Sequence, residues 1–120
     1  MADKTPASLS DQAAEAVRAL NHVTLPRPNL GWEYPGDAYT TVANLSALAR
    51  MLSQALGQID SFVTDLAEGD HLQSDKGADD LPNRLAGLHM WLSDAQGQAK
   101  ALMRALEQAH QLLGPLSYKD

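Results

Sequence analysis

Hydrophobic residues recur at alternating steps of three and four positions along two long stretches of the chain. This 3.5-residue period is typical of helices that pack against each other as a coiled coil. It predicts one helix over about residues 37–68 and another over about residues 81–113. The first series is Val42, Leu45, Ala49, Leu52, Leu56, Ile59, Val63 and Leu66, and the second is Leu85, Leu88, Leu92, Ala95, Ala99, Leu102, Leu106, Ala109 and Leu113.

The two series fit each other if the chain folds back through the acidic turn at residues 70–80. In such an antiparallel hairpin, residues whose numbers sum to 151 face each other, and every a position meets a d position. Leu56 then faces Ala95 and Ala49 faces Leu102, so that large side chains meet small ones along the seam.

The two flanks of this predicted hairpin differ in polarity. The flank formed by the g positions is apolar and contains Leu48, Ala55, Phe62, Trp91, Ala105 and Leu112. The flank formed by the e positions is mostly polar and contains Ser46, Ser53, Asp60, His89, Gln96, Met103 and His110. We therefore expect an apolar groove on the g flank and a solvated surface on the e flank.

A shorter helix is predicted over about residues 9–21, with Ser10 as its N-cap. Residues 1–8 before it are expected to be flexible, and a crossover rich in Pro and aromatic residues follows at 22–36. The predicted fold is one all-α domain over residues 1–120, a helical bundle in which the long antiparallel hairpin holds the short helix in its groove. A helix of about 18 Å covers less than half of that groove, so the crossover or a second subunit must cover the rest.

Composition narrows the possible functions. The chain has 9 basic and 15 acidic residues, a net charge of −6 and no Cys. This excludes disulfide and thiolate chemistry and argues against direct binding of nucleic acid, which needs clustered positive charge. No apolar run is long enough to span a membrane, and residues 1–16 lack the apolar core of a signal peptide. The expected localisation is therefore cytoplasmic.

Motifs for catalysis or metal binding are missing. There is no Gly-rich phosphate loop, nucleophile elbow or HExxH motif. His89 and His110 are about 31 Å apart on one helix and cannot share an ion. The acidic turn at 70–80 lacks the alternating ligands and terminal Glu of an EF-hand loop. We therefore expect a protein that is not an enzyme, with no catalytic, cofactor-binding or metal-binding residues and no cofactor.

The most unusual local feature is an aromatic segment at residues 32–39. Its Trp and Tyr side chains either plug the uncovered part of the groove or form a recognition patch, since such residues dominate binding hot spots. The candidate partner-binding residues, taken from this segment and from the apolar flank, are Trp32, Tyr34, Tyr39, Leu48, Phe62 and Trp91.

The function that these patterns favour is a protein–protein interaction or assembly module that associates with itself, with a homodimer expected. One alternative is an indirect regulator of a DNA-binding or mobile-element protein, acting as an acidic partner or DNA mimic. Another is an enzyme or small-ligand protein that uses the groove as a pocket. The sequence leaves open the identity of the partner and whether the short helix packs in its own subunit or swaps into another.

Three stretches of the chain, RALNH at 18–22, WEYPGDAY at 32–39 and LSALARMLSQALGQI at 45–59, carry a resemblance. The chain resembles a group of small uncharacterised helical proteins of high-GC actinobacteria. The resemblance implies an actinobacterial origin among mobile-element or phage-associated genes and transfers no catalytic residue. The chain also resembles, in length, acidity and lack of Cys, the secreted WXG100 helical hairpins. It departs from their motif, because Glu33 and Tyr34 follow Trp32 and the Trp lies before the hairpin instead of at its turn.

Overall fold

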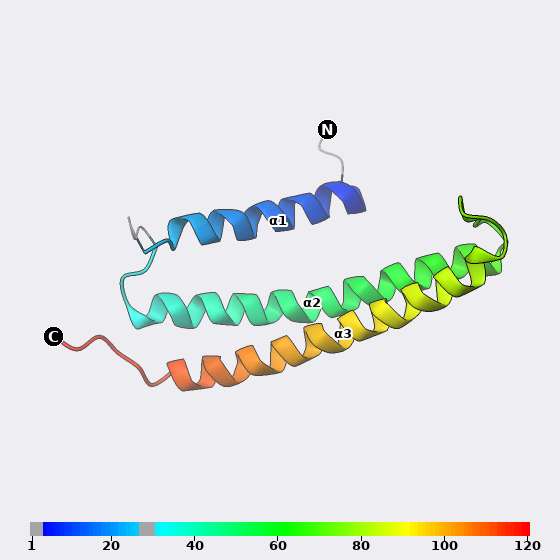
Figure 1. Ribbon diagram of the computed structural model, residues 1–120. Coiled ribbons are helices and arrows are strands. Elements are labelled where there is room, and N and C mark those ends of the chain that lie inside the picture. The colour runs from blue at the N-terminus through cyan, green and yellow to red at the C-terminus, as the bar shows by residue number, and fades with distance from the viewer. Residues whose placement is uncertain (1–3, 27–30) are drawn as a thin grey trace.

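The computed structural model describes residues 4–26 and 31–120 and contains three α-helices in that part of the chain. They are α1 (Pro6–Val23), α2 (Pro35–Glu68) and α3 (Asp80–Leu113), and the described residues form no strand. Figure 1 shows α2 and α3 side by side as a long antiparallel hairpin, with α1 running along the first half of α2 in the opposite direction. The predicted all-α hairpin is confirmed.

α1 begins three residues before its predicted start because of a reciprocal cap. The Ser8 backbone N–H donates to the Thr5 hydroxyl, and the Thr5 backbone N–H donates to the Ser8 hydroxyl, each at 3.1 Å. Pro6 occupies the first helical position, where its missing N–H costs nothing. Ser10 is therefore not the N-cap, and its hydroxyl donates to the Ala7 carbonyl instead.

This cap also corrects part of the expected flexible segment. Residues 6–8 are helical, and residues 1–3 lie outside the described residues. The connection between α1 and α2 is shorter than the predicted crossover and comprises residues 24–34, of which 27–30 lie outside the described part.

The starts of the two long helices also differ slightly from prediction. α2 begins at Pro35, so Asp37 lies inside its first turn and is not the N-cap. The Asp37 carboxylate accepts hydrogen bonds from the backbone N–H groups of Tyr34 and Glu33, both at 2.9 Å, and these two bonds lower its pKa. α3 begins at Asp80, one residue before its predicted start.

α2 ends in a Schellman motif whose left-handed residue is an aspartate. The His71 N–H donates to the Leu66 carbonyl at 2.9 Å, and the Asp70 N–H donates to the Ala67 carbonyl at 3.1 Å. Asp70 has a φ of 58°, whereas the preceding Gly69 has an ordinary φ of −84°. The end of α2 at Glu68 agrees with the predicted range, and the strained backbone conformation of the turn lies at Asp70.

Contacts between α2 and α3 agree with the predicted register. When the numbers of two facing seam residues in an antiparallel coiled coil add up to 151, the numbers of two opposing e-position residues must add up to 149. Four contacts between the helices do so: Ser46 with Met103, Ser53 with Gln96, Asp60 with His89, and Tyr39 with His110. The register inferred from hydrophobic spacing therefore describes the hairpin.

The flank that closes is the one that was expected to be solvated. Ala49, which is 1% exposed, lies with the buried Ser46, Ser53 and Ala99 on the side of the seam toward the e positions. The Ser46 hydroxyl donates to the Met103 carbonyl at 3.4 Å and the Ser53 hydroxyl to the Gln96 carbonyl at 3.5 Å. Small side chains let the two backbones approach on this flank, so Ser46 and Ser53 are buried and the prediction that they are solvated is wrong.

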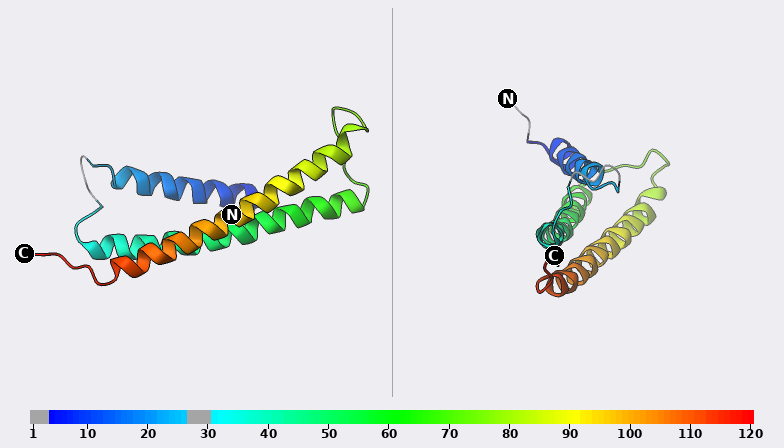
Figure 2. Two further views of the ribbon diagram at one scale, coloured as in Figure 1. Left: turned by 60° about the horizontal axis from the view of Figure 1, so that its bottom comes forward. Right: turned by 90° about the vertical axis from the view of Figure 1, so that its left-hand side faces the viewer.

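The expected packing of the short helix in the groove is not observed. No Cα atom of α1 lies within 8 Å of a Cα atom of α2 or α3, and α1 has no buried residue. Closely packed helices have axes only about 8–10 Å apart, so α1 lies beside the hairpin without interlocking with it. Figure 1 shows this gap along α1, and in the right-hand view of Figure 2 α1 lies on the other side of the start of α2 from the end of α3. The connection of residues 24–34 sets the place of α1 more directly than side-chain packing does.

Replacing Ala49 with Leu tests the small-residue seam. The larger side chain has no space between the helices, so we expect the Ala49→Leu variant to lose about 1–3 kcal/mol of unfolding free energy. Chemical denaturation followed by circular dichroism measures this loss. The same substitution at the exposed Ala101 of α3 is the control and should change stability by less than about 0.5 kcal/mol. Equal effects at both positions would show that the backbones are not in close contact at Ala49.

Replacing Asp70 with Gly tests the strained end of α2. Glycine adopts a positive φ without steric cost, so we expect Asp70→Gly to raise the unfolding free energy by about 1 kcal/mol. Thermal denaturation would detect this as a higher midpoint. Asp70→Ala keeps the Cβ and removes only the carboxylate, and it should bring no such gain. A comparable gain in both variants would assign the effect to charge and not to the backbone.

Candidate functional site

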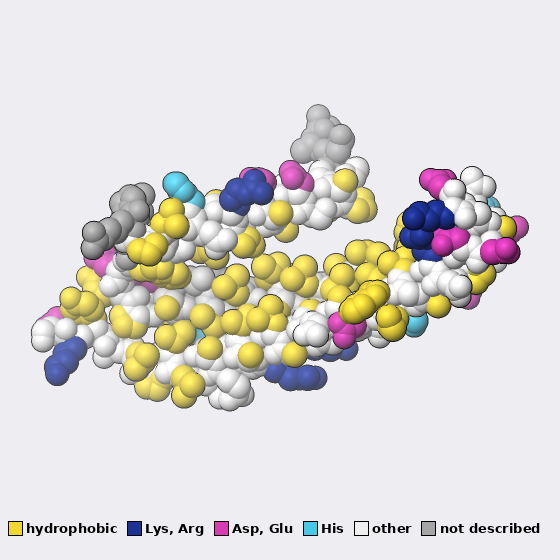
Figure 3. Space-filling model, in the orientation of Figure 1, with side chains coloured by type: hydrophobic (Ala, Val, Ile, Leu, Met, Phe, Trp, Pro, Cys, Tyr) yellow, Lys and Arg dark blue, Asp and Glu magenta, His cyan; other side chains and the backbone are white. Residues whose placement is uncertain are grey.

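One continuous surface of the hairpin exposes large apolar side chains. We call it the apolar face and define it by eight residues at d and g positions. Seven of the eight are exposed, and Leu48 is half-buried. The residues are Leu48, Leu52, Ile59, Phe62, Leu88, Trp91, Leu102 and Leu112. Figure 3 shows hydrophobic side chains along the hairpin and along the side of α1 that faces it, with open space between them.

The apolar face carries no charge along its length. At the d and g positions from residue 45 to 66 in α2, every residue is apolar. From residue 88 to 112 in α3 the only polar residue at these positions is Gln98. Contiguous exposed apolar surface of this kind is typical of sites that bind another protein. No charged group at these positions would have to lose its hydration when the face is covered.

The structure divides the predicted partner-binding residues into two groups. Phe62 and Trp91 lie on the apolar face and are 62% and 66% exposed. Tyr34 and Tyr39 lie at the open end of the hairpin and make contacts within the chain. The Tyr39 ring stacks on His110 with centroids 3.9 Å apart, and Tyr34 meets Tyr118 edge-on at 5.6 Å. These two tyrosines therefore support the fold.

Trp32 and Leu48 complete the predicted set. Trp32 is 38% exposed and precedes α2 at the same open end, whereas Leu48 lies within α2 on the apolar face. Twenty-three residues of helix, about 35 Å, separate Tyr39 from Phe62. The aromatic segment at 32–39 and the apolar face are thus two separate places on the molecule.

The opposite flank is basic. Arg50 from α2 and Lys100 and Arg104 from α3 border a shallow depression that no carboxylate lines. None of the three is ion-paired with another described residue. Exposed, unpaired cations keep this flank hydrated. The apolar face is therefore the surface of the hairpin that is suited to a dry contact.

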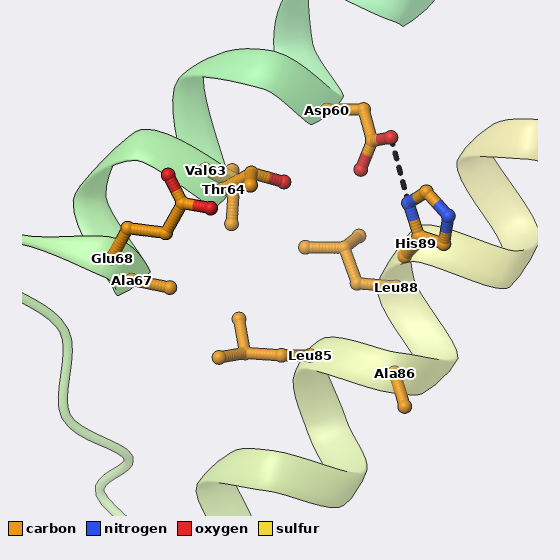
Figure 4. A pocket seen from close by; sticks show the side chains of 9 residues that line it. All are labelled: Asp60, Val63, Thr64, Ala67, Glu68, Leu85, Ala86, Leu88 and His89. Atoms are coloured by element: carbon orange, nitrogen blue, oxygen red, sulfur yellow. Dashed lines mark hydrogen bonds and ion pairs between the residues drawn. The ribbon is translucent and has the colours of Figure 1, made fainter.

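An apolar hollow of about 350 Å³ opens between α2 and α3 near the hairpin turn. Figure 4 shows Val63, Ala67 and Leu85 among its lining residues, with Asp60 and His89 at the edge. His89 Nδ1 lies 2.8 Å from Asp60 Oδ2, which links the two helices. His89 was expected to be a solvated helix-face residue. The pair could have been found in the sequence, since it satisfies the register rule for e positions.

The acidic turn is organised around Asp80, whose carboxylate faces a cation. The Arg84 guanidinium Nε donates to one carboxylate oxygen at 2.6 Å, and the Ser74 hydroxyl donates to the same oxygen at 2.6 Å. Arg84, and secondarily Ser74, lower the pKa of Asp80. Within the described residues no cluster of three or more His, Asp or Glu side chains is placed to hold a metal ion.

No family model, no curated protein and no solved structure matches the chain. In the described part of the chain, no helix is both long and apolar enough to cross a lipid bilayer.

The lowered pKa of Asp80 predicts how the hairpin turn responds to acid. A carboxyl group whose pKa is lower in the folded state stabilises that state when ionised. The contribution is present above the ordinary value of 3.8 and is lost as the pH falls through the folded pKa. In Arg84→Gln we expect the pKa of Asp80 to rise toward 3.8, as measured by NMR titration of its side-chain carboxyl. Asp37, whose pKa is lowered by backbone N–H groups, is the internal control and should not move. An unchanged pKa at Asp80 would contradict the pairing with Arg84.

Proposed function

We propose that this protein is a non-enzymatic interaction or assembly module that binds a helical protein partner through the apolar face. The single observation that supports this most directly is the exposure of that face in the folded chain. Leu, Ile, Phe and Trp side chains form an uncharged surface on two helices, and α1 does not close it. A partner helix with its own apolar face would fit between the ridges of α2 and α3.

The remaining chemistry of the described surface favours binding over catalysis. The Asp60–His89 pair joins two helices at the edge of an open hollow, and the apolar walls behind it offer van der Waals contact. Catalytic sites usually bring nucleophile, acid or base and oxyanion donors together in one cavity. Here the polar groups are used to hold the hairpin together. The proposal places the module in the cytoplasm, because a fold without cysteine needs no oxidising compartment.

Site-specific photocrosslinking tests this proposed function. A photoreactive phenylalanine analogue placed at position 62 should form an adduct with one protein species that mass spectrometry can identify, a second copy of this chain included. The same analogue at Met90, which is exposed on the same half of the hairpin but lies away from the apolar face, is the matched control. Adducts at position 62 alone are the expected result. No adduct at position 62, or the same adducts from both positions, would rule out the apolar face as the binding surface.

A further inference from the structure

The half of the apolar face near the hairpin turn lies beyond the reach of α1. α1 has 18 residues and spans about 27 Å, whereas α2 has 34 residues and spans about 51 Å. α1 runs along the first half of α2, at the open end of the hairpin (Figure 1). The face beyond it contains Ile59, Phe62, Leu88 and Trp91, which are 48%, 62%, 39% and 66% exposed. We call these four residues the tip patch.

The register makes the tip patch compact. In this register the numbers of two opposing g-position residues must add up to 153. Phe62 of α2 therefore lies across from Trp91 of α3. Ile59 and Leu88 occupy the d positions beside them. Aromatic side chains with aliphatic neighbours are the usual composition of a binding hot spot. The patch therefore offers one concentrated contact on the uncovered half of the hairpin.

The surface area of the chain indicates how much contact is missing. The chain exposes 9393 Å², whereas a compact monomer of this mass exposes about 6300 Å². Its radius of gyration is 19.5 Å, compared with about 13.6 Å for a compact domain of this length. The excess of about 3100 Å² is more than each subunit contributes to an obligate homodimer, about 1000–2500 Å². A second copy of the same chain could therefore bury the uncovered face and still leave the open end accessible.

We infer that the tip patch is the contact between two copies of this chain, which pack antiparallel across a two-fold axis beside Phe62 and Trp91. This inference rests on the proposed function and names its partner. The two turn-proximal halves form a four-helix core, and each α1 lies outside the overlap, along the open end of its own hairpin. The interface is isologous, so the tip patch of one copy meets the same patch of the other.

The charge at the rim of the tip patch predicts a different salt dependence for binding a second copy than for binding a cationic partner. Asp65 and Asp94 lie at c positions, next to the g positions of the tip patch. Arg84, the cation at the g position next to the patch, is already paired with Asp80 of its own chain. In a two-fold dimer the carboxylates of Asp65 and Asp94 come near those of the other copy, so added salt screens a repulsion. Self-association should therefore persist or strengthen as the salt concentration rises, whereas binding to a basic partner would weaken.

Light scattering behind a sizing column, over a wide range of protein concentration and at two salt concentrations, tests the inference. We expect a molar mass of about twice 12.9 kDa for the unmodified chain. Phe62→Ser and Trp91→Ser should each raise the dimer dissociation constant by about 30-fold or more. Met90→Ser, which changes an exposed residue away from the apolar face, is the control and should leave the constant unchanged.

Several outcomes would overturn the inference. A monomer at every concentration would do so, and photocrosslinking at position 62 to another protein would then still support the proposed function. A trimer, a dimer that survives both Ser variants, a dimer that Met90→Ser disrupts equally, or a dimer that weakens steeply with salt would also contradict it.

A second measurement avoids variants of the tip patch. Trp32→Phe leaves Trp91 as the only tryptophan of the two in the chain. Its fluorescence should be quenched by acrylamide at low protein concentration and be protected at high concentration, where the dimer forms. Equal quenching at both concentrations would show that Trp91 is not in the interface and would overturn the inference.

Discussion

The close approach of α2 and α3 along a row of small residues is the constraint on which the rest of the structure depends. Ala49, Ala99 and the serines at 46 and 53 are the only buried residues among those that the structure describes. The serine hydroxyls satisfy their hydrogen-bonding capacity on carbonyl groups of the opposite helix, so their burial does not carry the usual cost of a polar group. Because the backbones are close on this side, large apolar side chains at d and g positions, such as Phe62 and Trp91, remain exposed on the other flank. The apolar face therefore follows from how the hairpin closes.

This arrangement makes the stability of the hairpin depend on what covers it. Helices are stabilised mainly by burial of an apolar face and only weakly by their own backbone hydrogen bonds. Here the buried hydrophobic residues are two alanines, and no large side chain in the described part is fully buried. A partner that binds only the folded hairpin adds its binding free energy to folding. Under the proposed function, folding and association are therefore linked, because a partner on the apolar face would add to the burial that stabilises the helices.

The sequence predicted the helices and their register well because both depend on the spacing of residues. The 3.5-residue period located α2 and α3, and the rule that seam residues sum to 151 agrees with contacts such as Asp60 with His89. The polarity of the flanking residues failed to predict which flank of the hairpin is buried. The polarity of Ser46 and Ser53 predicts solvated side chains, but their small size lets them lie buried between the two helices. Tyr39 stacks on His110 and Tyr34 meets Tyr118 edge-on. These partners are 71 and 84 positions away in the chain, so local sequence could not assign the tyrosines to the fold.

The length of α1 and the position of its connection together determine which part of the apolar face can be used. The chain leaves α1 at Val23 and enters α2 at Pro35, so α1 must lie near the open end of the hairpin and run back along it. With about half as many residues as α2, it cannot reach the turn. The Tyr39–His110 stack and the Tyr34–Tyr118 contact fasten that same open end. The aromatic residues near the start of α2 therefore hold the hairpin closed, whereas Phe62 and Trp91 lie beyond the reach of α1 and stay exposed.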